Sequence, residues 1–281
     1  MGNHVHPCLC AKSMDDLLDR LKESPIQHRH VLGILDPKYT EWRPGGKPAY
    51  RLQFVGALPL LIVESTGTCM LLGDPNEPEA RQAVEVFHDS GLHELSLREE
   101  TAFRTIRAYL SDGSWRISRD YGLIQERFRP RPSESIRKLG VQDREEIREA
   151  CLRLPELGES KSTLRDFGYM EQGLPVICYG AFQDGSLVGF CSTNPICKGV
   201  TETSWVIVAN EFRRMGLAAG LLTLACEEAF VQGNAVGYYA GSAGEDLDAM
   251  VRSLGFQELK ANYRFIPAES DEQWRTWGRQ V

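Results

Sequence analysis

The stretch ANEFRRMGLAAGLL, residues 209–222, decides how the second half of this sequence is interpreted. It follows a short apolar strand pattern, WVIV, and leads into a run typical of a helix. The N-terminus of a helix has unpaired N–H groups and a partial positive charge, so a turn with few side chains can hold an anion there. Gly216 would let a phosphate approach the backbone, and Arg213 and Arg214 add positive charge. The alternative is an ordinary buried helix start.

Hydrophobic periodicity predicts the elements on both sides of this stretch. From residue 133 to residue 267 the pattern indicates a strand, a helix, three strands, a helix, a strand, a helix and a strand. Asp184 and Gly185 lie between two apolar runs and are a strong hairpin signal. This part of the chain is therefore expected to mix helices with a sheet.

The first half of the chain, from about residue 57, shows the same order of strand, helix, strand, helix and strand. Prolines, arginines and serines at 126–135 have the composition of a linker. We expect two α/β domains, 1–130 and 131–281, related by an internal repeat. Two unrelated α/β units are the alternative.

The passage in the first half that corresponds to the opening stretch is GDPNEPEARQAV, residues 73–84. It has no glycine after the strand and places Glu77 and Glu79 in the first helical turn. Acidic residues suit the helix dipole there, but they would repel a phosphate. Only the second copy is expected to bind an anion.

The pattern Arg213-x-x-Gly216-x-Ala218 resembles motif A of the GNAT acyltransferases, [QR]-x-x-G-x-[GA], whose loop holds the pyrophosphate of acyl-coenzyme A. The element order is also similar, as is SLGF at 253–256, which matches the LGF that often ends the family's fourth helix. The resemblance covers about residues 133–267 and implies a GNAT fold, an α+β arrangement of a central mixed, mostly antiparallel sheet flanked by helices. With a degenerate GNAT-like α/β domain before it, the chain resembles tandem GNAT proteins.

The resemblance implies acetyl-CoA as cosubstrate. The family's strand before motif A carries a bulge that splays it from the next strand, its backbone pairs with the pantetheine arm, and an N–H at the bulge, here that of Val206, would polarise the thioester. The implied binding residues are Val206, Ile207, Val208, Arg213, Arg214, Met215, Gly216, Leu217, Ala218, Ala219 and Ser242.

An amine must be neutral when it attacks a thioester, so a base is needed to remove its proton. Glu202 lies eleven residues before Arg213, which is the spacing of the glutamate base in the histone-acetylating members of the family. Alternation along the strand places Glu202 on the same face as Ser204 and Val206. A solvated charge at a strand start is the alternative.

Many GNAT enzymes place a tyrosine as general acid four residues before the glycine of LGF, where this chain has Val251. A thiolate with a pKa of about 8 to 9 can leave without much help. Tyr238 and Tyr239 point to opposite faces of their strand, so either is a candidate acid and the other a packed residue.

The acceptor pocket is expected under a lid formed by residues 159–175. In it, Asp166, Glu171, Phe167 and Tyr169 could contact a cationic amine. A solvated loop is the alternative. The net charge of −7 argues against nucleic acid as a partner and slightly favours a positively charged amine.

The bulk composition is typical of a globular protein, with 42% hydrophobic and 25% charged residues. The start of the chain lacks the pattern of a secretory signal and no apolar run has membrane length, so we expect a cytoplasmic protein with no membrane partner, monomeric or homodimeric. The eight cysteines are too dilute for a disulfide framework. His4, His6, Cys8 and Cys10 could bind a metal, but no second ligand pair follows, so none is expected.

These features predict an N-acetyltransferase that moves an acetyl group from acetyl-CoA to a primary amine of a small molecule by direct attack in a ternary complex. No cysteine stands beside a histidine as a convincing nucleophile, which disfavours a covalent intermediate. The alternatives are a non-catalytic acyl-CoA-binding or sensor protein and an acetyltransferase for a protein or peptide amine. The sequence does not identify the amine or the length of the acyl chain.

Overall fold

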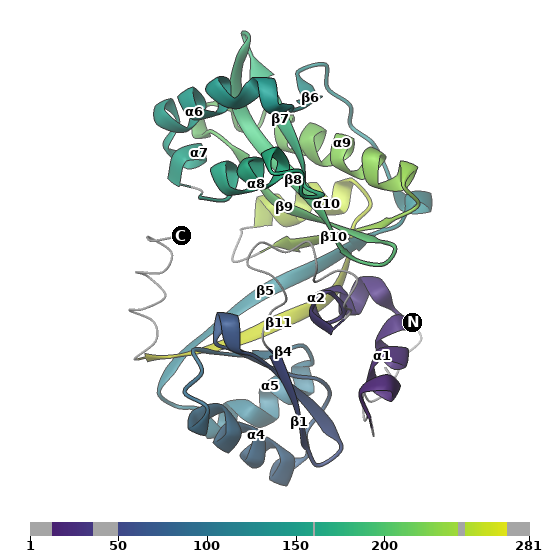
Figure 1. The fold of residues 1–281 in the computed structure, drawn as a ribbon, viewed down its shortest axis with the longest axis vertical. Coiled ribbons are helices and arrows are strands. Elements are labelled where there is room, and N and C mark those ends of the chain that lie inside the picture. Colours follow the sequence, from purple (N-terminus) through teal and green to yellow (C-terminus); the bar gives the residue numbers. More distant parts are fainter. Residues whose placement is uncertain (1–12, 36–49, 160, 241–244, 269–281) are drawn as a thin grey trace. The chain divides into compact units, whose positions relative to one another are not determined.

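The computed structural model describes residues 13–35, 50–159, 161–240 and 245–268, which form two compact units (Figure 1). Within these residues the first unit holds 13–24, 50–119 and 260–268, and the second unit holds 25–35 and 120–259. The chain passes between them inside β5 (Gly113–Leu123) and inside β11 (Gln257–Pro267). The units thus divide the chain differently from a single boundary near residue 130. A degenerate GNAT-like domain at 1–130 stays a prediction.

In the first unit the strand order is β1-β2-β3-β4-β11-β5. Neighbouring strands are antiparallel from β1 to β3 and from β4 to β11, whereas β3 and β4 are parallel. The elements in this unit are α1 (Met14–Lys22), β1 (Tyr50–Val55), β2 (Leu58–Val63), η1 (Glu64–Thr66), β3 (Thr68–Leu71), α4 (Glu77–Asp89), β4 (Glu94–Leu97), α5 (Glu100–Ile106) and η2 (Arg107–Tyr109). The expected order of strand, helix, strand, helix and strand is confirmed by β3, α4, β4, α5 and β5.

In the second unit the strand order is β5-β10-β9-β8-β7-β6. The strands from β6 to β9 are antiparallel to their neighbours and β9 is parallel to β10, so the sheet is mixed and mostly antiparallel, as expected. The elements are α2 (Pro25–Leu35), η3 (Gln125–Arg127), β6 (Ile136–Lys138), η4 (Val141–Asp143), α6 (Arg144–Arg153), α7 (Pro155–Glu159), α8 (Lys161–Glu171), β7 (Ile177–Gln183), β8 (Ser186–Cys197), β9 (Val200–Val208), η5 (Asn210–Phe212), α9 (Leu217–Val231), β10 (Ala235–Ala240) and α10 (Glu245–Ser253).

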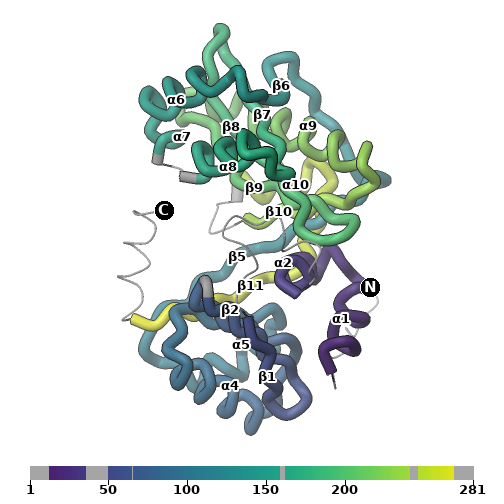
Figure 2. The backbone as a smooth tube through the Cα atoms, viewed as in Figure 1, coloured from purple at the N-terminus to yellow at the C-terminus, as the bar shows by residue number. Residues whose placement is uncertain are grey.

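Helices cover both faces of the second unit's strands (Figure 1, Figure 2). Alternation along β7 and β8 sends Cys178 and Phe190 to the side of α6–α8, and Tyr179 and Cys191 to the side of α9. The hairpin between these strands turns at Asp184, with φ of 50°, and Gly185, with φ of 79°. A turn with positive φ at both central residues matches strand twist, and the hairpin prediction is confirmed.

Most of the expected lid at 159–175 is helix α8, so the alternative of a solvated loop is wrong, and the role as a lid stays a prediction. Asp166 is buried and accepts a hydrogen bond from the Ser192 hydroxyl at 2.6 Å. Glu171 pairs with the guanidinium of Arg144 at 2.6 Å. Both carboxylates therefore have partners within the fold.

Candidate active site

The N-terminus of α9 presents an exposed turn without a side-chain cap. Gly216 is the N-cap residue, with φ of 81°, and among the described residues no side chain bonds to the first-turn N–H groups. A Cβ placed on Gly216 would meet no atom within 4 Å. The space beside Gly216 at the N-terminus of α9 is therefore open, which suits an anion.

Two arginines flank this turn. Arg213 is exposed, and its Nε donates a hydrogen bond to the carbonyl oxygen of Val208 at 3.2 Å, which ties the turn to the end of β9. Arg214 is exposed and has φ of 65°, in the left-handed region that few non-glycine residues adopt. The turn therefore carries positive charge next to a helix N-terminus.

Strand β9 carries a bulge a few residues before this turn. Cys191 of β8 pairs with Val206, but Thr193 pairs with Thr203, so Ser204 and Trp205 together lie opposite one residue of β8. Pairing between β9 and β10 runs from Val200 to Thr203 in the described part of the chain. Past Thr203 the backbone of β9 therefore has one edge that β10 does not pair.

Glu202 lies just before the point where the two strands part, opposite Gly237 in the register. It is only 9% exposed, so the alternative of a solvated charge is wrong. Its Oε2 accepts a hydrogen bond from Nε of Arg29, a side chain on α2 that is fully buried. A Cβ at position 237 would lie 2.3 Å from that Nε, so the close approach of Arg29 requires glycine there.

Arg29 also pairs with Asp120 of β5, at 3.3 Å between Nη2 and Oδ1, and donates from Nη1 to the carbonyl of Ile26. Burial by itself lowers the pKa of Arg29, but the charges of Glu202 and Asp120 outweigh it and hold that pKa above its ordinary value. The guanidinium is therefore a fixed positive charge that holds two carboxylates in place.

His30 follows Arg29 on α2 and faces the same two carboxylates. Its Nε2 lies 3.6 Å from Oε1 of Glu202 and 3.8 Å from Oδ1 of Asp120. Its ring meets that of Tyr239 edge-on, with 6.0 Å between centroids. We call Arg29, His30, Asp120 and Glu202 the carboxylate cluster.

Residues 142–256 match the family model described as the acetyltransferase (GNAT) family. This part of the chain is a GNAT acetyltransferase domain. The family transfers acetyl groups from acetyl-CoA, and the chain is an acyltransferase. Glu202 belongs to the matched residues, whereas Arg29, His30 and Asp120 lie outside them.

Solved structures have the same fold over most of the chain. A Drosophila protein is 14% identical with a TM-score of 0.60, covering 90% of this chain and 95% of its own. A GCN5-related N-acetyltransferase from Kribbella flavida is 15% identical with a TM-score of 0.58, covering 86% and 94%. A tandem GNAT protein from the clavulanic acid biosynthesis pathway is 18% identical with a TM-score of 0.51, covering 80% and 81%. No curated protein matches the sequence.

The two tyrosines of β10 take opposite faces, as alternation predicts. Tyr238 is buried in the apolar cluster of the GNAT domain, edge-on to Phe256 and together with Val251, and burial raises its pKa. Tyr239 is half-buried on the other face, next to His30. Of the two, Tyr239 is the one near the carboxylate cluster.

Sequence reasoning does not find Arg29, His30 or Asp120. The one signal in the sequence is HRH at 28–30, which places charge within the otherwise apolar segment PIQHRHVLGIL. Trp205 is also missed, although its side chain is 62% exposed at the bulge.

Some predicted residues lie outside the described part of the chain, namely Ser242 and the candidate metal ligands His4, His6, Cys8 and Cys10. Within the described part, no group of three or more potential metal ligands occurs. Likewise, no helix there is both long and apolar enough to span a bilayer. The cysteines Cys178, Cys191 and Cys226 are buried, which raises the pKa of each thiol and makes them poor nucleophiles.

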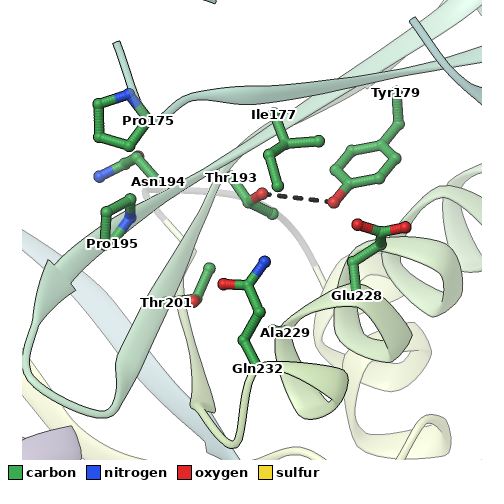
Figure 3. A pocket seen from close by; sticks show the side chains of 10 residues that line it. All are labelled: Pro175, Ile177, Tyr179, Thr193, Asn194, Pro195, Thr201, Glu228, Ala229 and Gln232. Carbon is green, nitrogen blue, oxygen red and sulfur yellow. Dashed lines mark hydrogen bonds between the residues drawn. The ribbon is translucent and has the colours of Figure 1, made fainter.

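A separate small pocket of about 140 Å³ opens on the α9 side of the GNAT domain (Figure 3). Tyr179 and Thr193 of the hairpin strands and Glu228 of α9 line it, and the two hydroxyls lie 3.5 Å apart. Glu228 already pairs with Lys138 at 3.0 Å. Thr201 lines this pocket, and since the next residue in β9 points to the opposite face, the pocket is separate from Glu202.

Proposed function

We propose that this protein is an N-acetyltransferase that transfers the acetyl group of acetyl-CoA to a primary amine of a small molecule by direct attack in a ternary complex. The observation that carries the proposal is the juxtaposition of two features within a GNAT domain. One is the uncapped, exposed N-terminus of α9, and the other is the edge of β9 that β10 leaves unpaired beyond the bulge.

The residues at these two features suit the cosubstrate. The N–H groups from Arg214 to Ala219 would hold the pyrophosphate, and Gly216 offers no side chain to obstruct it. The edge of β9 from Val206 to Val208 would pair with the amides of the pantetheine arm. The thioester supplies an activated acyl group, and the Val206 N–H would polarise its carbonyl. The proposed set is Val206, Ile207, Val208, Arg213, Arg214, Met215, Gly216, Leu217, Ala218, Ala219 and Ser242.

Glu202 would take part in removing the proton from the amine. Its position beside the point where β9 and β10 part supports this role, as does the close approach of His30. With Val251 in the place of the usual tyrosine, either Tyr239 donates to the leaving thiolate or the thiolate departs without an acid. Tyr238 is less suited, because it packs in the core.

The net charge of −7 supports a cationic small amine as acceptor. We further propose the cytoplasm as its compartment, supported by buried cysteines that are free thiols. The absence of the usual tyrosine at Val251 favours one other candidate, a non-catalytic acyl-CoA sensor.

The test is release of free thiol from acetyl-CoA in the presence of pooled small amines, amino acids and peptides, together with calorimetry of CoA binding. We expect turnover with a pool of small amines. Binding of CoA without turnover in any pool would favour the sensor, and turnover with peptides alone would replace the small amine by a protein acceptor. The absence of both CoA binding and turnover would overturn the proposal.

A further inference from the structure

The carboxylate cluster gathers ionisable side chains from separate elements around one imidazole. Arg29 and His30 come from α2, Glu202 from β9 and Asp120 from β5, and the ring of Tyr239 on β10 meets that of His30 edge-on. Arg29 and Glu202 are 173 residues apart in the chain. Ionisable side chains that converge from three separate elements are typical of a functional site rather than of a solvated helix face.

Each oxygen of Glu202 faces a different partner. Oε2 accepts the hydrogen bond from Arg29, which leaves Oε1 directed at Nε2 of His30 at 3.6 Å. For Asp120, a single oxygen, Oδ1, faces both Arg29 and His30. Two carboxylates therefore lie next to one edge of the imidazole, where they would stabilise positive charge.

Glu202 itself is poorly placed to take a proton. Its side chain is nearly buried, and protonation would leave the buried guanidinium of Arg29 without this counter-charge. Protonation of His30 would not remove a counter-charge from Arg29. Its side chain is 24% exposed while its Nε2 is buried, so the exposed part of the ring lies away from the carboxylates.

His30 also lies beside the point where strands β9 and β10 part. Glu202 is opposite Gly237, one pair before the last pair between β9 and β10. Tyr239, which the His30 ring contacts, is the first β10 residue beyond that last pair. The proposed function places the thioester where these strands part.

We propose that His30 is the general base of this enzyme, and that Glu202 and Asp120 position its imidazole and stabilise the imidazolium. This inference rests on the proposed function and makes it more specific. A hydrogen on Nε2 would face the carboxylates, and the lone pair on Nδ1 would then take the proton. Helix α2, which precedes the matched GNAT residues, thereby supplies a group to the reaction.

The reaction begins with a proton transfer to His30. Nδ1 takes one proton from the ammonium, which yields a neutral amine and an imidazolium. The amine lone pair forms a bond to the thioester carbonyl carbon, and the carbon–sulfur bond breaks with its electron pair on sulfur. The second proton on the attacking nitrogen passes to the thiolate, which gives the amide and the thiol. His30 then returns its proton to water.

The test compares His30→Gln with the wild type in kcat/KM across about pH 6 to about pH 10, with calorimetry of CoA binding and thermal unfolding of each variant. His88→Gln is the matched control, because His88 is an exposed histidine on α4 in the first unit. We expect His30→Gln to lose about 100-fold in kcat/KM at neutral pH. The loss should shrink as pH approaches the pKa of the amine, where neutral amine is already present. CoA affinity and His88→Gln should stay unchanged.

Three outcomes would overturn the inference in different ways. An unchanged rate in His30→Gln overturns the role of His30 and leaves acetyl transfer standing. An equal loss at every pH assigns His30 a structural role. No transfer by the wild type to any amine overturns both proposals together. A further measurement uses the wild type alone and does not depend on whether a variant folds. In ¹⁵N-histidine spectra, hydrogen on Nε2 of neutral His30 supports the inference, and hydrogen on Nδ1 contradicts it.

Discussion

Helices α4 and α9 both begin shortly after a strand, but their first turns differ. At α4 the side chain of Asn76 accepts from the Glu79 N–H at 3.0 Å, and the Glu79 side chain accepts from the Asn76 N–H at 3.0 Å. This capping box satisfies the turn from within the chain. At α9 the N-cap is Gly216, and no side chain of the described residues bonds to the turn.

The charged residues at the first turns of α4 and α9 also differ. Glu77 and Glu79 place negative charge in the first turn of α4, where they satisfy the helix dipole. No acidic residue occupies the first turn of α9, and the exposed Arg214 stands just before it. The same structural feature is thus used for stability in one helix, while in the other it is left available to an anion.

The change with the largest expected effect makes the α9 turn resemble that of α4. Gly216→Glu adds a carboxylate next to the proposed phosphate position, so CoA affinity should fall by at least about 100-fold, or about 2.7 kcal/mol. Calorimetry with CoA measures it. The matched control is Gly233→Glu, since Gly233 lies just after the other end of α9 with φ of 74° and open space around it. Equal loss in both variants would mean that backbone strain is responsible.

Much of this contrast can be predicted from sequence, because turns and caps are local signals. Gly216, the acids of α4 and the Asp184-Gly185 hairpin each depend on residues within a few positions of one another. The bulge in β9 is predicted only through the family resemblance. It is a property of pairing with β8, and the residues at 204–205 carry no turn signal of their own.

What sequence reasoning missed depends on long-range packing. The sequence does not predict helix α8, which the buried bond between Asp166 and Ser192 anchors to the sheet. The carboxylate cluster is a stronger case. Arg29 meets Glu202 across 173 residues, and no local pattern indicates that contact.

A smaller effect is expected from removing the positive charge alone. Arg214→Ala should weaken CoA binding by about tenfold, which corresponds to about 1.4 kcal/mol, and should make binding less sensitive to salt. Titrations at low and high salt measure both effects. The control is Arg148→Ala, which should bind CoA as the wild type does. Arg148 is an exposed arginine on α6 that pairs only loosely with Glu145, at 3.6 Å. Equal weakening by both variants would assign the effect to net charge.

The smallest effect is expected at α4. Asn76→Ala removes the capping box, and an unsatisfied first turn should lower the free energy of unfolding by about 1 kcal/mol. Denaturant unfolding measures this loss, and calorimetry should show unchanged CoA affinity because the turn of α4 binds no anion. Arg81→Ala is the control, because it removes an exposed ion pair with Glu77 and a contact with the Tyr109 ring but leaves the capping box intact, and its loss should lie well below that of Asn76→Ala. A fall in CoA affinity with Asn76→Ala would contradict the division of roles between the two helix starts, since it would give the acidic turn a part in binding.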